Sequence, residues 1–256
     1  MAWTRALSRL LLAGSILFAS NAVASADPNV LWRIVHNQCV PHQRERDEPA
    51  PCAAVNSGEG FALLKDTDGA AQYLLIPTER ITGIESPALL APDATDYFAQ
   101  AWLARAAVDE RLGRNVPRDW MSLAVNSEFA RSQNQLHIHI DCLRADVHDA
   151  LTRHAGDIGP VWAPFPEPLA GDRYSAIAVA GDDLGAVNPF RLLADGVPGA
   201  RTDMGRRTLV VAGAVLSNGQ PGFIVLAGLV DPATGDTGGG EAVQDHQVCA
   251  APMAGK

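Results

Sequence analysis

The stretch that decides the fold runs from residue 132 to residue 141 and reads Ser132-Gln133-Asn134-Gln135-Leu136-His137-Ile138-His139-Ile140-Asp141. Apolar and polar side chains alternate through its second half. Because successive side chains of a β-strand point to opposite faces, this alternation is typical of a half-buried strand. We therefore predict a strand over residues 135–143 that displays His137, His139 and Asp141 on one face and buries the two isoleucines.

A polar loop at residues 126–134 precedes this strand and opens onto its histidine face. The loop offers amide, hydroxyl and guanidinium donors from Asn126, Arg131, Ser132, Gln133 and Asn134. Phosphoryl transfer needs such donors, because negative charge on the non-bridging oxygens must be held while the leaving group departs. The loop therefore favours a phosphate site, although a loop arginine is as often only a solvated charge.

Two imidazoles on one strand face permit three interpretations. Neutral histidines can be hydrogen-bonded within a polar patch. They can ligate a metal with Asp141 and one further histidine, for which the candidates are His36, His42, His148, His154 and His246. One of them can also attack phosphorus while its neighbours orient it. The amide-rich loop favours the nucleophile, since a zinc site would need more imidazole or thiolate here, and we predict neither metal nor cofactor.

The flanking sequence predicts a mixture of helices and antiparallel strands. Strand-like runs at residues 60–64 and 72–76 flank the turn signal Asp66-Thr67-Asp68-Gly69, which indicates a hairpin, and residues 208–216 and 222–230 indicate a second one. Residues 93–112 have helical periodicity, with Asp93 or Thr95 as the cap and Gly113 as the end. A strand at 121–125 and a helix at 146–154, capped by Asp146, complete a predicted α+β fold.

The first 26 residues have the pattern of a secretory signal. Arg5 and Arg9 precede an apolar run at residues 10–18, and Ala24-Ser25-Ala26 has the form of a cleavage site. An uncleaved membrane anchor is the alternative, although the run is shorter than the ~20 apolar residues of a span. In either case we expect residues 27–256 to be one domain at the periplasmic face of the inner membrane, anchored or peripheral, and periplasmic if the signal is cleaved.

Charge, composition and the cysteines further limit the class of protein to which this chain can belong. The formal net charge of -9 argues against nucleic acid as a ligand, and 47% hydrophobic residues indicate a globular chain. All four cysteines follow the signal, and an even number in an oxidising compartment suggests two disulfides in one of three pairings. We favour Cys39–Cys52, which closes a short loop, and Cys142–Cys249, which ties the C-terminus to the centre. A four-cysteine zinc site is disfavoured, because no C-x-x-C pair exists.

The polar loop and the histidine strand together resemble a known signature. Asn126, Gln133 seven residues later, and His137-Ile138-His139-Ile140-Asp141 four residues after the glutamine are similar to the signature of the histidine-triad (HIT) superfamily, with Asp141 in the place of the third histidine. Further landmarks resemble one member family, the bacterial CDP-diacylglycerol pyrophosphatases, over roughly residues 31–249. They are Leu31-Trp32-Arg33-Ile34-Val35, Cys39-Val40-Pro41, Pro51-Cys52, Gln72-Tyr73-Leu74-Leu75, Gly83-Ile84-Glu85-Ser86-Pro87 and Gln244-Asp245-His246.

The resemblance implies a disulfide-tied, HIT-like α+β hydrolase that cleaves the pyrophosphate of CDP-diacylglycerol to CMP and phosphatidate in phospholipid metabolism. It implies that His139 is the nucleophile, forming a nucleotidyl-histidine intermediate, and that His137 buttresses it. The phosphate oxygens would be held by Asn126, Ser132, Gln133 and Asn134. Asp141 is expected only to support an imidazole.

The expected partners are CDP-diacylglycerol and the membrane surface, where the acyl chains stay in the bilayer; no nucleic acid or protein partner is predicted. Lys65 and Tyr73 are candidates for nucleotide contacts, and Glu85 is read as structural. His246 would reach the site if Cys249 pairs with Cys142. Two alternatives stay open: a metal-dependent phosphohydrolase that uses His137, His139 and Asp141 as ligands, and a non-catalytic nucleotide- or lipid-binding module.

Overall fold

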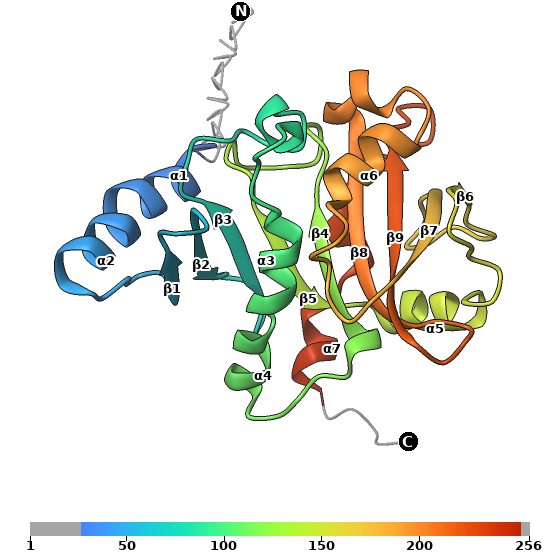
Figure 1. Ribbon diagram of the computed structural model, residues 1–256, viewed down its shortest axis with the longest axis horizontal. Coiled ribbons are helices and arrows are strands. Elements are labelled where there is room, and N and C mark those ends of the chain that lie inside the picture. The colour runs from blue at the N-terminus through green and yellow to red at the C-terminus, as the bar shows by residue number, and fades with distance from the viewer. Residues whose placement is uncertain (1–26, 252–256) are drawn as a thin grey trace, which may run out of the picture.

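The computed structural model describes residues 27–251, and Figure 1 shows the arrangement of its helices and strands. The predicted signal segment at residues 1–26 lies outside the described residues. Within the described part of the chain, no helix combines the length and the hydropathy that a membrane span needs.

One antiparallel sheet runs through the described chain and carries nine strands in the order β1-β2-β3-β5-β4-β8-β9-β7-β6. The strands are β1 (Ala54–Asn56), β2 (Phe61–Lys65), β3 (Tyr73–Pro77), β4 (Met121–Val125), β5 (Ile138–Cys142), β6 (Ala163–Pro164), β7 (Tyr174–Ala180), β8 (Arg207–Val215) and β9 (Pro221–Leu229). Every neighbouring pair is antiparallel. The predicted α+β class with an antiparallel sheet is therefore confirmed.

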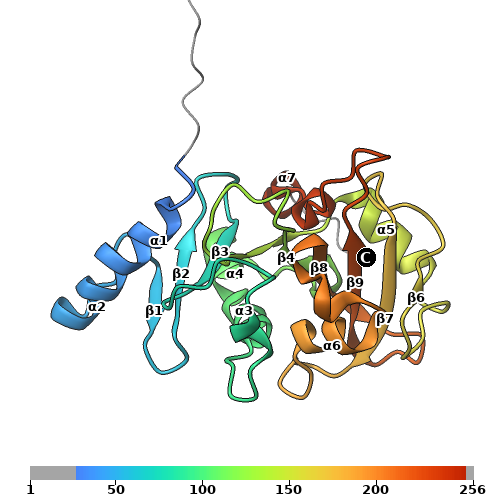
Figure 2. The same cartoon turned by 90° about the horizontal axis from the view of Figure 1, so that it is seen from above.

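Helices and short helical turns connect and cover these strands. The α-helices are α1 (Val30–Ile34), α2 (Val40–Arg46), α3 (Tyr97–Ala104), α4 (Ala106–Leu112), α5 (Ala145–Arg153), α6 (Pro189–Gly196) and α7 (His246–Ala250). A π-helical turn, η1 (Val35–Cys39), joins α1 to α2, and the 3-10 turns are η2 (Pro87–Leu90), η3 (Arg118–Trp120), η4 (Ala200–Thr202), η5 (Met204–Arg206) and η6 (Gly240–Val243). Figure 2 shows α3 and α6 on one side of the sheet and α5 on the other.

Both predicted hairpins are present. β2 pairs with β3 from Phe61 opposite Pro77 to Lys65 opposite Tyr73, and β8 pairs with β9 along nine residues of each strand. Strand β4 covers the predicted residues 121–125. These segments are apolar runs bounded by turn residues, which is why their position could be read from the sequence.

The histidine strand β5 lies in the sheet between β3 and β4, but it begins at Ile138 rather than at residue 135. The prediction was three residues too long at this end, because pairing with β3 stops at Leu75 opposite Ile138 and the N–H of Leu136 donates to the carbonyl of Ile81. Instead, the side-chain amide of Gln135 donates to the carbonyl oxygens of Pro77 and Glu79, at 3.0 and 2.8 Å.

The two faces of β5 have different surroundings. Ile138 and Ile140 belong to the largest hydrophobic cluster, in which Phe98 and Trp102 of α3 are fully buried. The opposite face carries His139 and Asp141. On this same face of the sheet, α1 and η1 pack on Leu64 of β2 and Leu74 of β3 and form a separate hydrophobic cluster. The space between that cluster and the C-terminal segment is where the polar side chains gather.

Two predicted helix caps were wrong. The helix expected at residues 93–112 begins after Asp96, whose carboxylate accepts from the N–H of Ala99, whereas the hydroxyl of Thr95 donates to the carbonyl of Glu59. The helix is divided at Arg105 and ends, as predicted, at Gly113, which has a φ of 66°. Helix α5 begins at Ala145, so Asp146 lies in its first turn and pairs with Arg144 instead of capping it.

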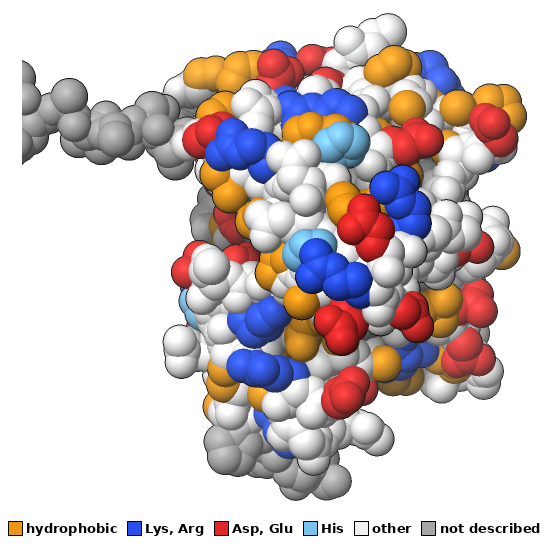
Figure 3. Space-filling view, turned by 90° about the vertical axis from the view of Figure 1, so that its left-hand side faces the viewer, with side chains coloured by type: hydrophobic (Ala, Val, Ile, Leu, Met, Phe, Trp, Pro, Cys, Tyr) orange, Lys and Arg blue, Asp and Glu red, His pale blue; other side chains and the backbone are white. Residues whose placement is uncertain are grey.

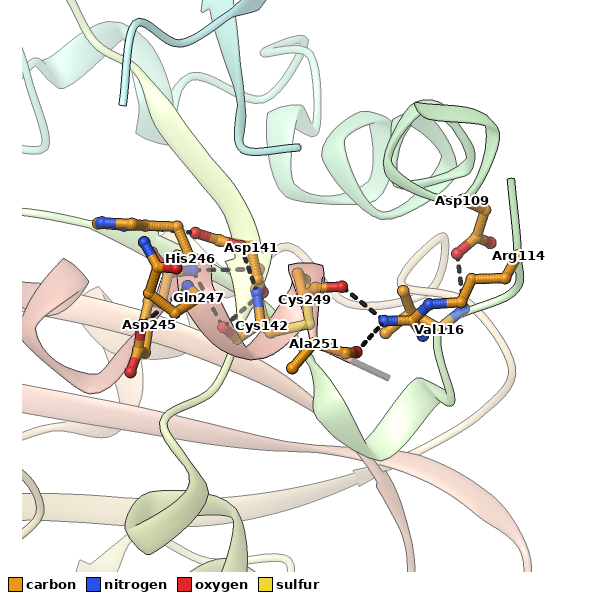
Figure 4. The surroundings of a disulfide bond; sticks show 12 residues. Asp109, Arg114, Val116, Asp141, Cys142, Asp245, His246, Gln247, Cys249 and Ala251 are labelled. Carbon is orange, nitrogen blue, oxygen red and sulfur yellow. Dashed lines mark hydrogen bonds and ion pairs between the residues drawn. A yellow bond between two sulfur atoms is a disulfide. The ribbon is translucent and has the colours of Figure 1, made fainter. Parts of the chain in front are cut away.

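Both favoured disulfides are present. Cys39–Cys52 links residues 13 apart at the end of η1, and Cys142–Cys249 links residues 107 apart. The second bond fixes α7 against the end of β5, where Arg114 donates to the carbonyl oxygens of Cys249 and Ala251 (Figure 4), both at 2.6 Å. The C-terminal segment is therefore held beside the histidine strand.

Candidate active site

A cavity of about 580 Å³ lies over the polar face of β3 and β5, which is in the usual size range for a small-molecule site. Its apolar lining consists of Val30, Leu31, Ile34, Leu64, Leu74 and Ala130. Its polar lining consists of Lys65, Asp66, Thr67, Asp68, Gln72, Asn126, Ser132, Gln133, His137, His139, Asp141, Glu241, Gln244 and His246. Both histidines of the strand motif therefore face one cavity.

His139 is held at Nδ1 by two side chains that sequence reasoning did not select. Nδ1 lies 2.9 Å from the side-chain nitrogen of Gln72 and 3.3 Å from Oε2 of Glu241. Nε2 has neither a hydrogen-bond partner nor solvent contact. Burial lowers the pKa of His139 to about 4, against an opposing effect of the negative charge of Asp66. The imidazole is therefore neutral at pH 7.

Glu241 owes its position to Asn126. The amide of Asn126 donates to Oε1 of Glu241 and accepts from the Glu241 N–H, both at 3.1 Å. An ionised carboxylate beside Nδ1 of His139 favours the tautomer with the proton on that nitrogen. This tautomer requires the Gln72 amide to turn, because the structure places its nitrogen, a donor, and not its oxygen beside Nδ1. In this arrangement Nε2 of His139 carries the lone pair.

His137 has a fixed tautomer as well. Its Nδ1 lies 2.7 Å from the carbonyl oxygen of Gln135, to which it can only donate, so Nε2 carries the lone pair when the ring is neutral. The ring centroid lies 4.9 Å from that of His139, edge to face. Burial, and then the neighbouring His139, lower the pKa of His137 to about 4. Two neutral imidazoles thus lie side by side.

The predicted phosphate donors have different environments. Asn126, Ser132 and Gln133 line the cavity, whereas Asn134 is exposed and does not line it. Gln133 accepts from the N–H of Leu31 and donates to the carbonyl of Asp27, both at 3.1 Å, so its amide holds the start of α1. Ser132 has no hydrogen bond from its side chain to any described residue, which leaves its hydroxyl available.

Arg131 is not free to bind phosphate. It makes two bonds to the carboxylate of Glu85, at 2.5 and 2.9 Å, and these bonds lower the pKa of Glu85 against the effect of burial. Gly83 leaves room for the pair, because a Cβ there would lie 2.0 Å from an Arg131 nitrogen. The segment Gly83-Ile84-Glu85 is therefore structural, as expected for Glu85.

Asp141 is buried beside the C-terminal segment. One carboxylate oxygen accepts from the N–H of Cys142 at 2.8 Å, and the other has no hydrogen-bond partner and lies 4.0 Å from Nδ1 of His246. Burial raises the pKa of Asp141 to about 6. Figure 4 shows His246 beside Asp141, next to the disulfide that holds α7.

The cavity lining is acidic overall. Asp66, Asp68, Asp141 and Glu241 contribute carboxylates, and Lys65 is the single lysine or arginine among the lining residues. The Lys65 ammonium donates to the carbonyl oxygens of Asp66 and Gly69, at 2.5 and 2.8 Å, and burial lowers its pKa. Tyr73, the other candidate for nucleotide contact, is buried in the core on the opposite face.

The predicted alternative set of metal ligands does not converge in residues 27–251. There, three ligand atoms lie within 4.8 Å of one another only in Asp141, Cys142 and Cys249, and both of these cysteines are in the disulfide. Of the other candidate histidines, only His246 lines the cavity. His148 instead stacks on Trp120 and contacts Asp119.

The fold and the cavity define an α+β enzyme with a buried pair of neutral imidazoles suited to nucleophilic attack. A family model described as CDP-diacylglycerol pyrophosphatase matches residues 26–252, and the chain belongs to this family of hydrolases. It is 42% identical over 247 residues to the CDP-diacylglycerol pyrophosphatase of Yersinia pestis, covering 95% of this chain and 93% of that protein.

Among solved structures, the chain is similar to the crystal structure of a DUF4931 family protein from Bacillus cereus. The likeness covers 80% of this chain and 92% of that one, with 11% sequence identity and a TM-score of 0.44. At this level it carries no argument about function.

Proposed function

We propose that this protein hydrolyses the pyrophosphate bond of CDP-diacylglycerol to CMP and phosphatidate through a nucleotidyl-histidine intermediate on His139. Membership of the family supports the substrate. The observation that carries the mechanism is the environment of His139: a neutral imidazole at a cavity, with Nδ1 beside Glu241 and Nε2 without a partner.

In the first step, the lone pair on Nε2 attacks the phosphorus that bears cytidine. A nitrogen–phosphorus bond forms, the bond to the bridging oxygen breaks, and its electron pair leaves with phosphatidate. This leaving group is a phosphate monoester and a weak base, so it needs little help from a general acid. Because Nε2 has no solvent contact in the free protein, attack requires the lining to open around the ring as substrate binds.

In the second step, water attacks the same phosphorus, the nitrogen–phosphorus electrons return to Nε2, and a water proton is released. While the intermediate exists, the imidazole carries positive charge, and the carboxylate of Glu241 beside Nδ1 stabilises it. The low pKa of His139 keeps its lone pair available between attacks. His137 buttresses the ring from its edge.

We assign the remaining polar residues from their bonds. Ser132 has a free hydroxyl at the cavity and is the predicted donor that can bind a phosphate oxygen without breaking an existing contact. The amides of Asn126 and Gln133 act first as positioning groups, for Glu241 and for α1 respectively. Asn134 would need to move to reach the substrate, and Asp141 supports the site through His246.

We also propose that the reaction takes place at the periplasmic face of the inner membrane. Support comes from the sequence, where Arg5 and Arg9 precede an apolar run at residues 10–18. Two disulfides are typical of an oxidising compartment and point the same way.

The acidic lining favours one second candidate, a phosphohydrolase that uses a divalent cation to offset the carboxylates around the diphosphate. Exhaustive chelation separates the two readings. We expect hydrolysis of CDP-diacylglycerol to continue within twofold, and a loss that added Mg²⁺ or Zn²⁺ restores would favour the cation mechanism.

The direct test of the assigned roles compares two single variants. We expect His139→Ala to abolish release of CMP and His137→Ala only to weaken it, because only His139 adjoins both Glu241 and Gln72. The matched control is His148→Ala, a buried histidine outside this cavity. Equal and mild losses in both cavity variants would contradict the roles, and absence of turnover by the wild type would favour a binding module.

A further inference from the structure

We infer that the aliphatic wall, defined as Val30, Leu31, Ile34, Leu64 and Leu74, is the subsite for the diacylglycerol part of the substrate. This inference rests on the proposed function and adds the orientation of the bound substrate, whose lipid part lies on the α1 side of His139.

The register of the sheet separates two sides of the catalytic strand. Leu64 on β2 pairs with Leu74 on β3, Leu74 pairs with His139 on β5, and His139 pairs with Ala124 on β4. On the β2 and β3 side, α1 covers the two leucines and completes the aliphatic wall. On the β4 side, Asn126 follows the end of the strand and holds Glu241. His139 therefore has the aliphatic wall toward α1, whereas the β2–β3 turn (residues 65–72) and the β4 side supply polar lining.

The chemistry of each wall indicates which half of the substrate it fits. Cytosine has a polar edge that donates and accepts hydrogen bonds, and a buried polar edge without partners is costly. The aliphatic wall consists of Val, Leu and Ile side chains, which offer no such partner. Acylglycerol, in contrast, is stabilised by apolar contact at about 0.8 kcal/mol for each buried CH₂ group. The aliphatic wall thus fits the lipid, and the nucleotide is left to the polar side.

The size of the cavity limits how much of the lipid it can take. About 580 Å³ suits a drug-sized ligand, and the nucleotide and diphosphate already fill most of such a volume. Only the glycerol and the first acyl carbons can therefore contact the aliphatic wall. The rest of each chain must pass α1, where Val30 is 37% exposed at the rim.

The position of the aliphatic wall in the chain also suits a membrane-bound substrate. Val30 lies 12 positions after Phe18, the end of the apolar run at residues 10–18. A chain of that length spans at most about 40 Å when extended. Figure 3 shows the face that carries α1 and α2, where basic, acidic and hydrophobic side chains are mixed. This face has no single-sign patch, so apolar contact rather than charge is the feature it offers to a lipid.

The wall is fixed relative to the site by the loop before the histidine strand. Gln133 bonds to the N–H of Leu31 and to the carbonyl of Asp27, and the N–H of Asn134 donates to the carbonyl of Pro28 at 2.6 Å. The same loop contributes Ser132 to the cavity. These bonds thus link the α1 part of the aliphatic wall to the loop that carries Ser132.

The test uses two water-soluble substrates, so that binding to a bilayer does not enter. Dihexanoyl CDP-diacylglycerol carries short chains, and CDP-glycerol carries none. We expect the double variant Val30→Asn, Ile34→Asn to lower kcat/KM for the dihexanoyl compound roughly tenfold, as the loss of a few apolar contacts does in other pockets. For CDP-glycerol, measured as a substrate or as a competitive inhibitor, we expect a change of less than twofold.

The matched control is Val161→Asn, at a 72% exposed position that does not line the cavity. Equal losses for both substrates, or no loss for either, would overturn the inference. If the double variant does not fold by circular dichroism, the single variant Val30→Asn at the exposed rim gives the same comparison. Failure of the proposed function looks different, because the wild type would then hydrolyse neither compound.

Discussion

Glu241 offers the sharpest prediction, because the sequence motif does not contain it. Replacing Glu241 by Gln keeps the shape and the bonds to Asn126 but removes the charge beside Nδ1 of His139. A hydrogen bond to a charged group contributes about 1.5–3 kcal/mol. Since the Glu241 side chain is 48% exposed, water screens it and we take the lower part of that range. About 1.5–2 kcal/mol corresponds to a roughly ten- to thirtyfold loss of kcat.

The assay is release of CMP from dihexanoyl CDP-diacylglycerol at saturating and subsaturating concentrations. We expect kcat to fall and KM to change less than twofold, because Glu241 acts on the imidazole and not on the bound substrate. Glu241→Asp should recover part of the loss. The control is Glu45→Gln, at an exposed position of α2. A kcat within twofold of the wild type, or a rise in KM alone, would refute the reasoning.

Three further predictions concern pH and stability. If His139 attacks as a neutral imidazole, kcat/KM should fall at acid pH with an apparent pKa near 4, because burial lowers the pKa of His139 to about that value. An apparent pKa near 6.5 that persists in Asp141→Asn would contradict this prediction. Burial raises the pKa of Asp141 from 3.8 to about 6, so the wild type loses stability as pH rises from about 4 to about 6. In urea titrations, Asp141→Asn should therefore be more stable than the wild type by about 3 kcal/mol at pH 8 and equally stable below pH 4, and a difference that does not change with pH would argue against the shift. The entropy of loop closure predicts that Cys249→Ser lowers the free energy of unfolding by about 5 kcal/mol, because its disulfide closes a loop of 107 residues, and that Cys52→Ser lowers it by about 3 kcal/mol, because its loop spans 13 residues. A larger loss of thermal stability in Cys52→Ser than in Cys249→Ser would contradict this prediction.

Local patterns predicted the centre of the sheet well. The alternation around Ile138 and Ile140 and the turn signals between the paired strands are strong, short-range features, and the structure confirms the elements that they indicate. The errors fell at boundaries. Asp93, Thr95 and Asp146 are all chemically able to cap a helix, and only tertiary contacts decide which of several such residues does so.

Two elements had weaker signals. Strand β7 contains three alanines, a residue type that is depleted in strands, and it is held by pairing with β9 along its whole length. Helix α6 follows the cap Asn188 and begins at Pro189, and both are residue types preferred at these positions, so this helix could have been predicted. The prediction contained neither element.

The candidate site divides in the same way. His137 and His139 could be found from the strand alternation, and Asn126 and Gln133 from the polar loop and its resemblance to a known signature. Glu241 could not, because it lies 102 positions after His139 and reaches the ring through η6 and the amide of Asn126. Interactions of this kind are set by the chain path between distant segments, and no local pattern in the sequence marks them.

The central claim is that His139 forms a covalent bond to phosphorus, and one measurement addresses it directly. The enzyme would be mixed with CDP-diacylglycerol that is labelled in the phosphate next to cytidine, quenched within a single turnover, digested and mapped by mass spectrometry. We predict labelled cytidylate on His139, and none on His139→Ala. Label on His137 or on any other residue, or CMP formation in the same time window without protein-bound label, would contradict the account.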